Sequence, residues 1–194
     1  MHDVRKASAA DVPALGAALG RAFHDDPVFA WMFPSPRARR RWAPRFFAIR
    51  LRQLLPQEEA YAVRGVGAAV WAQPGRWDLG WRGFLDMAPL TLGLGRRALR
   101  TTVGSARVEA AHRELPPHWY LAVLGVDPPH QGGGIGTALL APVLEECDRD
   151  GVGAYLETAT ERDVAFYSRF GFRVTGELSF PRGPVLWPMW RDPR

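Results

Sequence analysis

The segment 131–136 constrains this chain more than any other, because it reads Gln-Gly-Gly-Gly-Ile-Gly. It lies between an apolar run, 119–126, and a segment with apolar residues at helical spacing that begins at Ile135. Glycines at the start of a helix let the backbone approach a ligand closely and supply successive N–H donors to one concavity. Together with the positive end of the helix dipole, these donors bind a pyrophosphate without a charged side chain. We therefore expect a strand, a phosphate-binding turn and a helix, in that order.

Two other glycine motifs are excluded. A P-loop needs a lysine at its end, and the only lysine of the chain is Lys6. A dinucleotide-binding fingerprint needs a third glycine where Thr137 stands, although Glu157 lies at the distance expected for a ribose-binding acid. Too little chain follows to complete a dinucleotide-binding domain. A plain glycine-rich loop remains the alternative, but a loop in solvent has no need for so much backbone freedom.

The length of 194 residues and a hydrophobic content of 47% predict one globular domain, 1–194, with a sizeable core. Helical patterns cover 8–23, 37–55, 135–147 and 160–170, and 77–113 is helical in character but broken by glycines. Strand patterns cover 60–63, 66–72, 119–126, 154–159, 172–178 and 185–190. This order predicts an α/β fold with a mixed sheet flanked by helices. The apolar run 119–126 is typical of a strand buried on both faces.

Several classes of protein are excluded by composition. No apolar run reaches the roughly 18 residues of a membrane span, and the amino terminus lacks the apolar region of a secretory signal. The single cysteine, Cys147, cannot form an internal disulfide or a zinc site. We therefore expect a cytoplasmic protein that binds no metal and no membrane.

The net charge of +5 allows an anionic ligand, because arginine binds phosphates and carboxylates with two parallel hydrogen bonds. The arginine run at 37–41 would fit nucleic acid. Trp42, Phe46 and Phe47 interleave with that basic segment, however, and we expect these aromatic residues to form the core face of its helix. Since charge runs are usually solvated faces, nucleic acid is not the favoured partner.

Two widely spaced motifs carry a resemblance to a known family. The first is Val126-Asp127-Pro128 with the glycine segment 131–136, and the second is Phe-Tyr-Ser-Arg-Phe-Gly-Phe at 166–172. In this order they resemble the GNAT superfamily of N-acetyltransferases, and the closer likeness is to the puromycin N-acetyltransferase group. Further matching positions are 118–121, Pro142, 156–158 and 183–184. The likeness extends over about 112–192, and upstream it rests on 22–27 and on the hairpin after Tyr61.

The resemblance implies a mixed, mostly antiparallel central sheet with a splay between two parallel central strands, flanked by helices. Residues 1–115 would shape the acceptor site, and residues 116–194 would bind acetyl-CoA as co-substrate. The pyrophosphate would lie on the glycine loop, and the strand segment 124–126 would pair with the pantetheine arm. An N–H group of that strand would also meet the oxyanion of the tetrahedral intermediate.

The cofactor-binding residues implied in this way are Leu124, Gly125, Val126, Gln131, Gly132, Gly133, Gly134, Ile135, Gly136, Thr137 and Asp163. Many relatives carry a basic residue where Gly133 stands, and often an asparagine where Asp163 stands. Because Thr160-x-x-Asp163 matches a capping box, we favour a capping role for Asp163 and regard its cofactor contact as minor.

The resemblance assigns Tyr167 as the general acid, because a phenol at the thioester sulfur can donate a proton as the thiolate leaves. The alternative is a core aromatic residue, since Phe166 and Phe170 share its helix. Glu157, at the end of a strand beside the splay, is the candidate general base for the amine. Its alternative is a strand-end carboxylate that balances nearby arginines. His112 and His118 are weaker candidates for the same role.

Acceptor contacts are expected mainly from the amino-terminal half. Asp25 and Asp26 suit a cationic amine, although a simple turn explains them equally well. The other candidate contacts are Trp31 and His118, with Trp77, Trp81 and Phe84 as further aromatic walls or as core residues. The identity of the acceptor and the oligomeric state stay open.

Taken together, these residues predict an N-acetyltransferase that moves an acetyl group from acetyl-CoA to a primary amine of a small molecule. We expect direct attack in a ternary complex, because Cys147 lies in mid-helix and looks structural. The alternative is a non-catalytic acyl-CoA-binding or regulatory domain that contacts nucleic acid through its arginine-rich surface.

Overall fold

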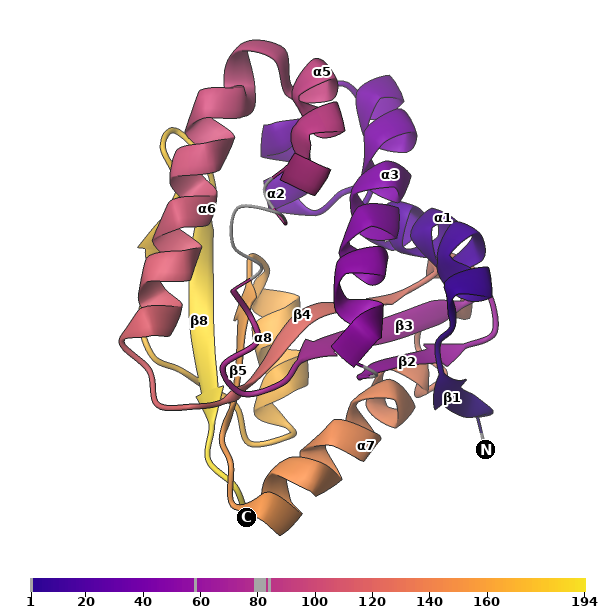
Figure 1. The fold of residues 1–194 in the computed structure, drawn as a ribbon, viewed down its shortest axis with the longest axis vertical. Helices are drawn as coiled ribbons and strands as arrows, with labels where there is room; N and C mark the ends of the chain where they lie inside the picture. The colour runs from indigo at the N-terminus through magenta and orange to yellow at the C-terminus, as the bar shows by residue number, and fades with distance from the viewer. Residues whose placement is uncertain (1, 58, 79–82, 84) are drawn as a thin grey trace.

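The computed structural model describes residues 2–57, 59–78, 83 and 85–194 (Figure 1). The helices are α1 (Val12–Ala22), α2 (Pro27–Met32), α3 (Pro36–Leu54), α5 (Thr91–Leu94), α6 (Ala98–Arg113), α7 (Ile135–Asp150) and α8 (Glu161–Ser168). Short 3-10 turns cover Ala9–Asp11, Leu55–Gln57, Ala88–Leu90, Gly95–Arg97 and Pro128–His130. The strands are β1 (Val4–Lys6), β2 (Ala60–Val63), β3 (Gly67–Ala72), β4 (Trp119–Val126), β5 (Ala154–Thr158), β6 (Arg173–Val174), β7 (Leu178–Ser179) and β8 (Val185–Arg191).

The strands form one sheet in the order β1-β2-β3-β4-β5-β8-β6, and β7 pairs with β8 beside this path. Among the described strands, β4 and β5 are the one parallel pair, and the other pairs are antiparallel. The pairing of β4 with β5 is limited to Trp119 with Ala154 and Tyr120 with Tyr155. Both strands continue beyond this point and diverge, so the expected splay is present. The predicted fold class is confirmed.

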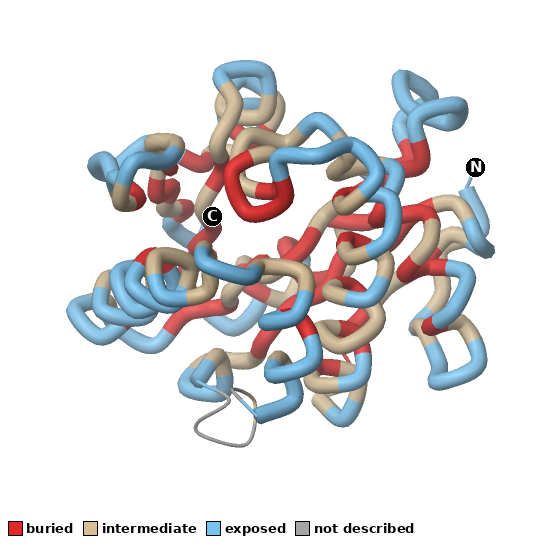
Figure 2. Tube along the Cα trace, turned by 90° about the horizontal axis from the view of Figure 1, so that it is seen from above, coloured by how far each residue is buried: buried red, intermediate tan, exposed pale blue. Residues whose placement is uncertain are grey.

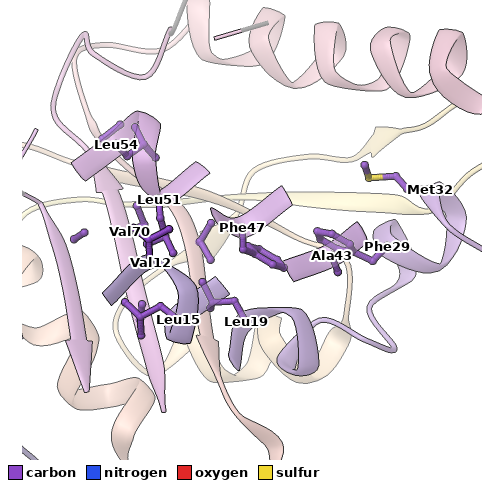
Figure 3. Close-up of a cluster of buried hydrophobic side chains, with 14 of the residues drawn as sticks. Val12, Leu15, Leu19, Phe29, Met32, Ala43, Phe47, Leu51, Leu54 and Val70 are labelled. Carbon is purple, nitrogen blue, oxygen red and sulfur yellow. The ribbon is translucent and has the colours of Figure 1, made fainter. Parts of the chain in front are cut away.

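Helices cover both faces of the sheet and create two cores. In Figure 1, α1 and α3 lie on one side of β2–β4 and α7 lies on the other. Leu19 of α1, Phe47 and Leu51 of α3 and Val70 of β3 meet in the first core (Figure 3). The second core lies under α7 and α8 and includes Leu139, whose side chain is fully buried. Figure 2 shows the buried residues concentrated in the strands and on the inward turns of the helices.

Local sequence explains where several of these helices begin and end. The Asp11 carboxylate accepts hydrogen bonds from the Ser8 backbone N–H and hydroxyl, as the predicted capping box requires. Gly151 follows α7 with a φ of +67°, a left-handed conformation that glycine adopts without steric cost. The segment 77–113, expected to be helical with breaks, contains the short helix α5 and the long helix α6 in its described part.

Two strand predictions are wrong in detail. The segment 172–178 forms two separate two-residue strands, β6 and β7, which pair with opposite ends of β8. Between them the Thr175 N–H donates to the Pro188 carbonyl, and Pro188 has no N–H with which to continue the ladder. The run 119–126 is not buried on both faces, because Tyr120, Ala122 and Leu124 are partly exposed. That face of β4 borders a cavity.

Candidate active site

The splay between β4 and β5 opens into a cavity of about 1640 Å³. The cavity extends from the glycine loop before α7 to residues of α2, α3 and α6. Glu157 of β5 and Tyr167 of α8 both line it. A typical small-molecule pocket has a volume of roughly 300–1,000 Å³, so this one has room for two ligands side by side.

The glycine loop presents free backbone donors at one end of this cavity. Gly132 and Gly134 have φ angles of +82° and +83°, a region that favours glycine. In the described structure, the N–H groups of residues 132–137 donate to no backbone or side-chain acceptor. A Cβ atom on Gly132 would meet no other atom within 4 Å, so the loop surface is open. These donors, at the amino-terminal end of a 16-residue helix, fit a diphosphate.

Side-chain contacts hold this loop in place. The Gln131 side-chain amide donates to the Val126 carbonyl at 2.9 Å. Arg21 of α1 forms a bidentate ion pair with Asp127, the residue that follows β4. His2 Nε2 lies 2.6 Å from the Gly133 carbonyl, which the sequence did not indicate because His2 is 131 residues away. An imidazole therefore lies beside Gly133 in the loop.

Ten of the eleven residues predicted to bind the cofactor line the cavity. They are Leu124, Gly125, Val126, Gln131, Gly132, Gly134, Ile135, Gly136, Thr137 and Asp163. Gly125 is also required by packing, because a Cβ atom there would lie 2.7 Å from Leu19 Cδ2. Ile135 is largely buried in the second core, and Gly133 is exposed on the loop.

Asp163 makes one of the two bonds of the predicted capping box, and its carboxylate bonds the Thr160 hydroxyl rather than the Thr160 backbone N–H. Its N–H donates to Thr160 Oγ1 at 3.1 Å, and its carboxylate accepts from the same hydroxyl at 2.7 Å. Thr160 is the N-cap residue of α8. The Asp163 carboxylate thereby stabilises the start of the helix that carries Tyr167.

Tyr167 lies near the carboxy-terminal end of α8, packed against Phe166 and Phe172. Its hydroxyl makes no hydrogen bond to any residue that the structure describes. Burial, and to a smaller extent the charge of Asp163, raise the pKa of Tyr167 well above its ordinary value. The phenol is therefore protonated at neutral pH and can donate a hydrogen bond toward a group in the cavity.

Glu157 faces the same cavity from the end of β5, next to a buried histidine. Its Oε1 lies 3.2 Å from Nε2 of His112, and the two side chains are only 6% and 1% exposed. The Trp77 ring stacks on His112 at 4.5 Å between centroids. The negative charge of Glu157 adds to burial in raising the pKa values of Tyr120 and Tyr155. A carboxylate in this position can attract a cationic amine and accept a proton.

The acceptor end of the cavity combines aromatic walls with acidic groups. Trp31 and Trp77 line it, and the Trp31 indole N–H donates to the Arg182 carbonyl at 2.9 Å. Asp25 also lines it and is exposed. Asp26 caps α2 by accepting hydrogen bonds from the N–H groups of Val28 and Phe29. Trp81 and Phe84, proposed as further walls, lie outside the described residues.

The structure lends no support to the expected contact between His118 and the substrate. His118 is buried and is absent from the residues that line the cavity. Its Nε2 lies 3.1 Å from Nδ1 of His112, and its Nδ1 lies 2.7 Å from the Pro116 carbonyl. His118 can therefore influence the site only through His112.

Two arginine positions change the interpretation of the basic charge. Arg39, inside the arginine run, is buried and donates to the carbonyls of Phe33 and Pro34, so it is structural. Arg50 lines the cavity, and sequence reasoning missed it. The sequence could have predicted this position, because Arg50 follows Phe46 by four residues and Phe47 by three and so shares their face of α3.

Cys147 is buried in α7 and does not line the cavity. Burial raises the pKa of its thiol to about 12, so it is not a thiolate at neutral pH.

Within the described residues, no helix combines the length and apolar character needed to cross a membrane. The same part of the chain holds no group of three or more histidine, cysteine, aspartate or glutamate side chains arranged for a metal ion.

Comparison with known proteins identifies relatives over most of the chain. An uncharacterized N-acetyltransferase of Schizosaccharomyces pombe is 24% identical over 185 residues, covering 87% of this chain and 73% of the relative. The N-alpha-acetyltransferase RimI of Mycobacterium tuberculosis is 39% identical over 85 residues, covering 43% of this chain and 52% of RimI.

Solved structures share the fold. A Corynebacterium glutamicum structure described as a histone acetyltransferase and related acetyltransferase superposes with a TM-score of 0.71 at 25% identity, covering 100% of this chain and 98% of that one. A polyamine N-acetyltransferase of Drosophila melanogaster gives 0.61 at 17% identity, covering 97% of this chain and 98% of that one.

The model of the acetyltransferase (GNAT) family matches residues 68–172, which run from β3 through the splay, the glycine loop and α8. The GNAT family uses acetyl-CoA as co-substrate. More than half of the chain matches, including the elements that build the cavity, so this protein belongs to the GNAT family of acetyltransferases.

Proposed function

We propose that this enzyme transfers the acetyl group of acetyl-CoA to a primary amine of a small molecule by direct attack in a ternary complex. The observation that carries the proposal is that Glu157 and Tyr167 line one cavity together with the free amides of the glycine loop. A cofactor whose diphosphate lies on those amides can run along β4 into the splay. Its thioester then lies between a proton acceptor and a proton donor.

The chain's own residues supply four effects. The N–H groups of 132–137 hold the diphosphate, and peptide groups of β4 orient the pantetheine arm. A β4 N–H stabilises the oxyanion of the tetrahedral intermediate. Glu157 receives a proton from the incoming ammonium, and Tyr167 donates toward the departing thiolate. No acyl-enzyme is needed, which agrees with the buried, protonated thiol of Cys147.

The acceptor is proposed from the cavity rather than from relatives, whose names point to different acceptors. Aromatic and aliphatic residues dominate the walls at the acceptor end, and carboxylates lie among them. Such a surface suits a small amine with an apolar or aromatic body. The resemblance to the puromycin N-acetyltransferase group points in the same direction and remains part of the proposal.

We also propose that residues 1–115 mainly shape the acceptor end while 116–194 mainly hold acetyl-CoA, in a cytoplasmic enzyme. Helices α2, α3 and α6 supply acceptor-end residues, whereas β4, α7 and α8 surround the cofactor end. Phe180 and Leu186 reach the acceptor end from the second half. The non-catalytic alternative gains no support, because the matched relatives are named acetyltransferases.

The test is release of the free thiol from acetyl-CoA in the presence of an amine panel. The panel contains phenethylamine, tyramine, puromycin, spermidine and a short peptide with a free amino terminus. We expect turnover that is fastest with the aromatic amines. Tight acetyl-CoA binding without turnover on any small amine would contradict the proposal, and turnover on the peptide alone would move the acceptor to protein amino termini.

A further inference from the structure

Three buried titratable side chains form a chain that starts in the wall of the cavity. His118 Nδ1 lies 2.7 Å from the Pro116 carbonyl, His118 Nε2 lies 3.1 Å from His112 Nδ1, and His112 Nε2 lies 3.2 Å from Glu157 Oε1. The three side chains come from α6, from the segment before β4 and from β5. Distant parts of the sequence are thus connected to one carboxylate.

The positions of the protons in this chain follow from what each atom can do. The Pro116 carbonyl can only accept, so His118 Nδ1 carries a proton. Burial is the largest cause that lowers the pKa of His118, which is therefore neutral and has a bare Nε2. That Nε2 must accept from His112 Nδ1. A neutral His112 then has no proton on Nε2, the atom that faces Glu157.

One proton therefore has a place between His112 and Glu157. Without it, a lone pair of Nε2 faces a carboxylate oxygen at 3.2 Å in a buried site, and the two side chains together carry one negative charge. With it, the two side chains form an ion pair whose charges cancel, and neither atom has a hydrogen-bond partner among the described residues. The two groups consequently bind this proton as a unit rather than as separate residues.

A positive charge that can balance Glu157 lies in the wall of the same cavity. Arg50 of α3 lines the cavity, and its Nη1 donates to Gln53 Oε1 at 3.2 Å. No described carboxylate lies within 4.0 Å of its guanidinium. Burial lowers the pKa of Arg50, whereas the charges of Glu109 and Glu157 raise it. Because Arg50 carries a positive charge, it favours the deprotonated form of the Glu157–His112 unit before an acceptor enters.

The two tyrosines beside this unit are neutral at neutral pH. Burial, aided by the charge of Glu157, raises the pKa of both Tyr120 on β4 and Tyr155 on β5. The Trp77 ring covers one side of His112. Glu109, one turn before His112 on α6, is exposed to solvent and screened by it.

We propose that Glu157 and His112 act as one proton-accepting unit for the amine, in which His118 fixes the tautomer of His112 and Arg50 balances the charge. The inference rests on the proposed function. The ammonium gives one proton to Glu157, which shares it with His112 Nε2. The freed lone pair forms the C–N bond, and the C–S bond breaks. The second nitrogen proton is transferred to the sulfur with the help of Tyr167, and the unit returns its proton to solvent.

Glu157 is the catalytic residue of this unit, and His112, His118 and Arg50 are positioning residues. The first test uses the wild-type protein labelled with ¹⁵N in its histidines and needs no substrate. Two-bond ¹H–¹⁵N spectra from about pH 6 to 9 should show His118 neutral with its proton on Nδ1. His112 should carry a proton on Nδ1, and Glu157→Gln should strongly shift the Nε2 resonance of His112. A proton on His118 Nε2, or a His112 Nε2 resonance that does not respond to Glu157→Gln, would overturn the proposal.

The second test is the pH dependence of kcat/KM with phenethylamine. In His112→Gln, a side-chain amide can donate permanently to Glu157, so the acid limb should move to lower pH and kcat should fall about tenfold or more. Arg50→Gln should move the acid limb to higher pH. His24→Gln, outside the cavity, should leave the limb in place.

The proposal would also be overturned if His112→Gln and Arg50→Gln both kept the acid limb of the wild-type pH profile while melting at the wild-type temperature. If a variant fails to fold, the spectra of the wild-type protein still decide. If no amine is acetylated at all, the proposed function fails, while the spectra continue to report on the proton chain.

Discussion

Arg21 holds Asp127 in a bidentate ion pair, with Nε to Oδ1 at 2.9 Å and Nη2 to Oδ2 at 2.6 Å. The pair connects α1 to the residue that follows β4, five residues before the first glycine of the loop. The Asp127 side chain is 10% exposed and the Arg21 side chain is 55% exposed. The ion pair therefore fixes the position of Asp127, which lies between β4 and the glycine loop.

Arg21→Gln should lower the free energy of unfolding by about 1 kcal/mol at neutral pH, because Asp127 then loses its charged partner. The Arg21 hydrogen bonds hold the pKa of Asp127 below its usual range. A carboxyl group with a lowered pKa stabilises the fold at pH values above its pKa in the unfolded chain. That stabilisation is lost as the pH falls through the lowered pKa. The difference between variant and wild type in urea unfolding should accordingly shrink below about pH 4. Arg64→Gln, at an exposed hairpin turn, is the control and should show no such difference.

Gly132→Ala and Gly65→Ala form a matched pair. Both glycines have positive φ angles, +82° and +65°, and a Cβ atom meets nothing within 4 Å at either position. Both substitutions should cost about 1 kcal/mol of stability through backbone strain. Only Gly132→Ala should also weaken acetyl-CoA binding in calorimetry, because it changes the N–H groups of the phosphate-binding loop. Equal affinity in the two variants would remove the loop from cofactor binding.

Tyr167→Phe should lower kcat by an order of magnitude or more and leave the Kd for acetyl-CoA nearly unchanged, because it removes a proton donor and no binding surface. Tyr61→Phe is the control, since Tyr61 lies on β2 outside the cavity and contacts Glu59. Steady-state kinetics and calorimetry on both variants provide the measurement. Full activity in Tyr167→Phe would leave Tyr167 with a packing role only.

Asp26→Asn tests a buried helix cap. Burial raises the pKa of Asp26 to about 6, against the two N–H groups that lower it. A raised carboxyl pKa stabilises the fold at low pH, and this contribution is lost as the pH rises from about 4 through about 6. Asparagine keeps a cap acceptor without the charge. Relative to wild type, the variant should therefore gain about 1–2 kcal/mol between these two pH values in urea unfolding. A constant difference across this range would contradict the prediction.

The sequence predicted the features that depend on neighbours along the chain. The glycine loop, the capping box at Ser8, the N-cap at Thr160 and the position of Tyr167 on a short helix are local patterns, and the structure contains each of them. The mixed sheet followed from the order of the elements.

Contacts between distant segments could not be predicted in the same way. His112 was a weak candidate because nothing near it in the sequence shows that it meets Glu157, 45 residues later. His118 was predicted to contact the substrate, but it lies against His112 and does not line the cavity. The run 119–126 was taken as buried on both faces because an apolar sequence does not distinguish a core from the wall of a cavity.

The short pairing of β4 with β5 has a consequence for how this enzyme responds to its co-substrate. Past Tyr120 the register between these strands ends, so β4 borders a gap inside the sheet rather than a neighbouring strand. A pantetheine arm, which has amide groups of its own, would occupy that gap as a substitute strand. Acetyl-CoA at about 100 times its Kd should then add about 2.7 kcal/mol to the unfolding free energy. Amide hydrogen exchange should slow most along residues 121–126, because bound acetyl-CoA would occupy the gap beside this part of β4.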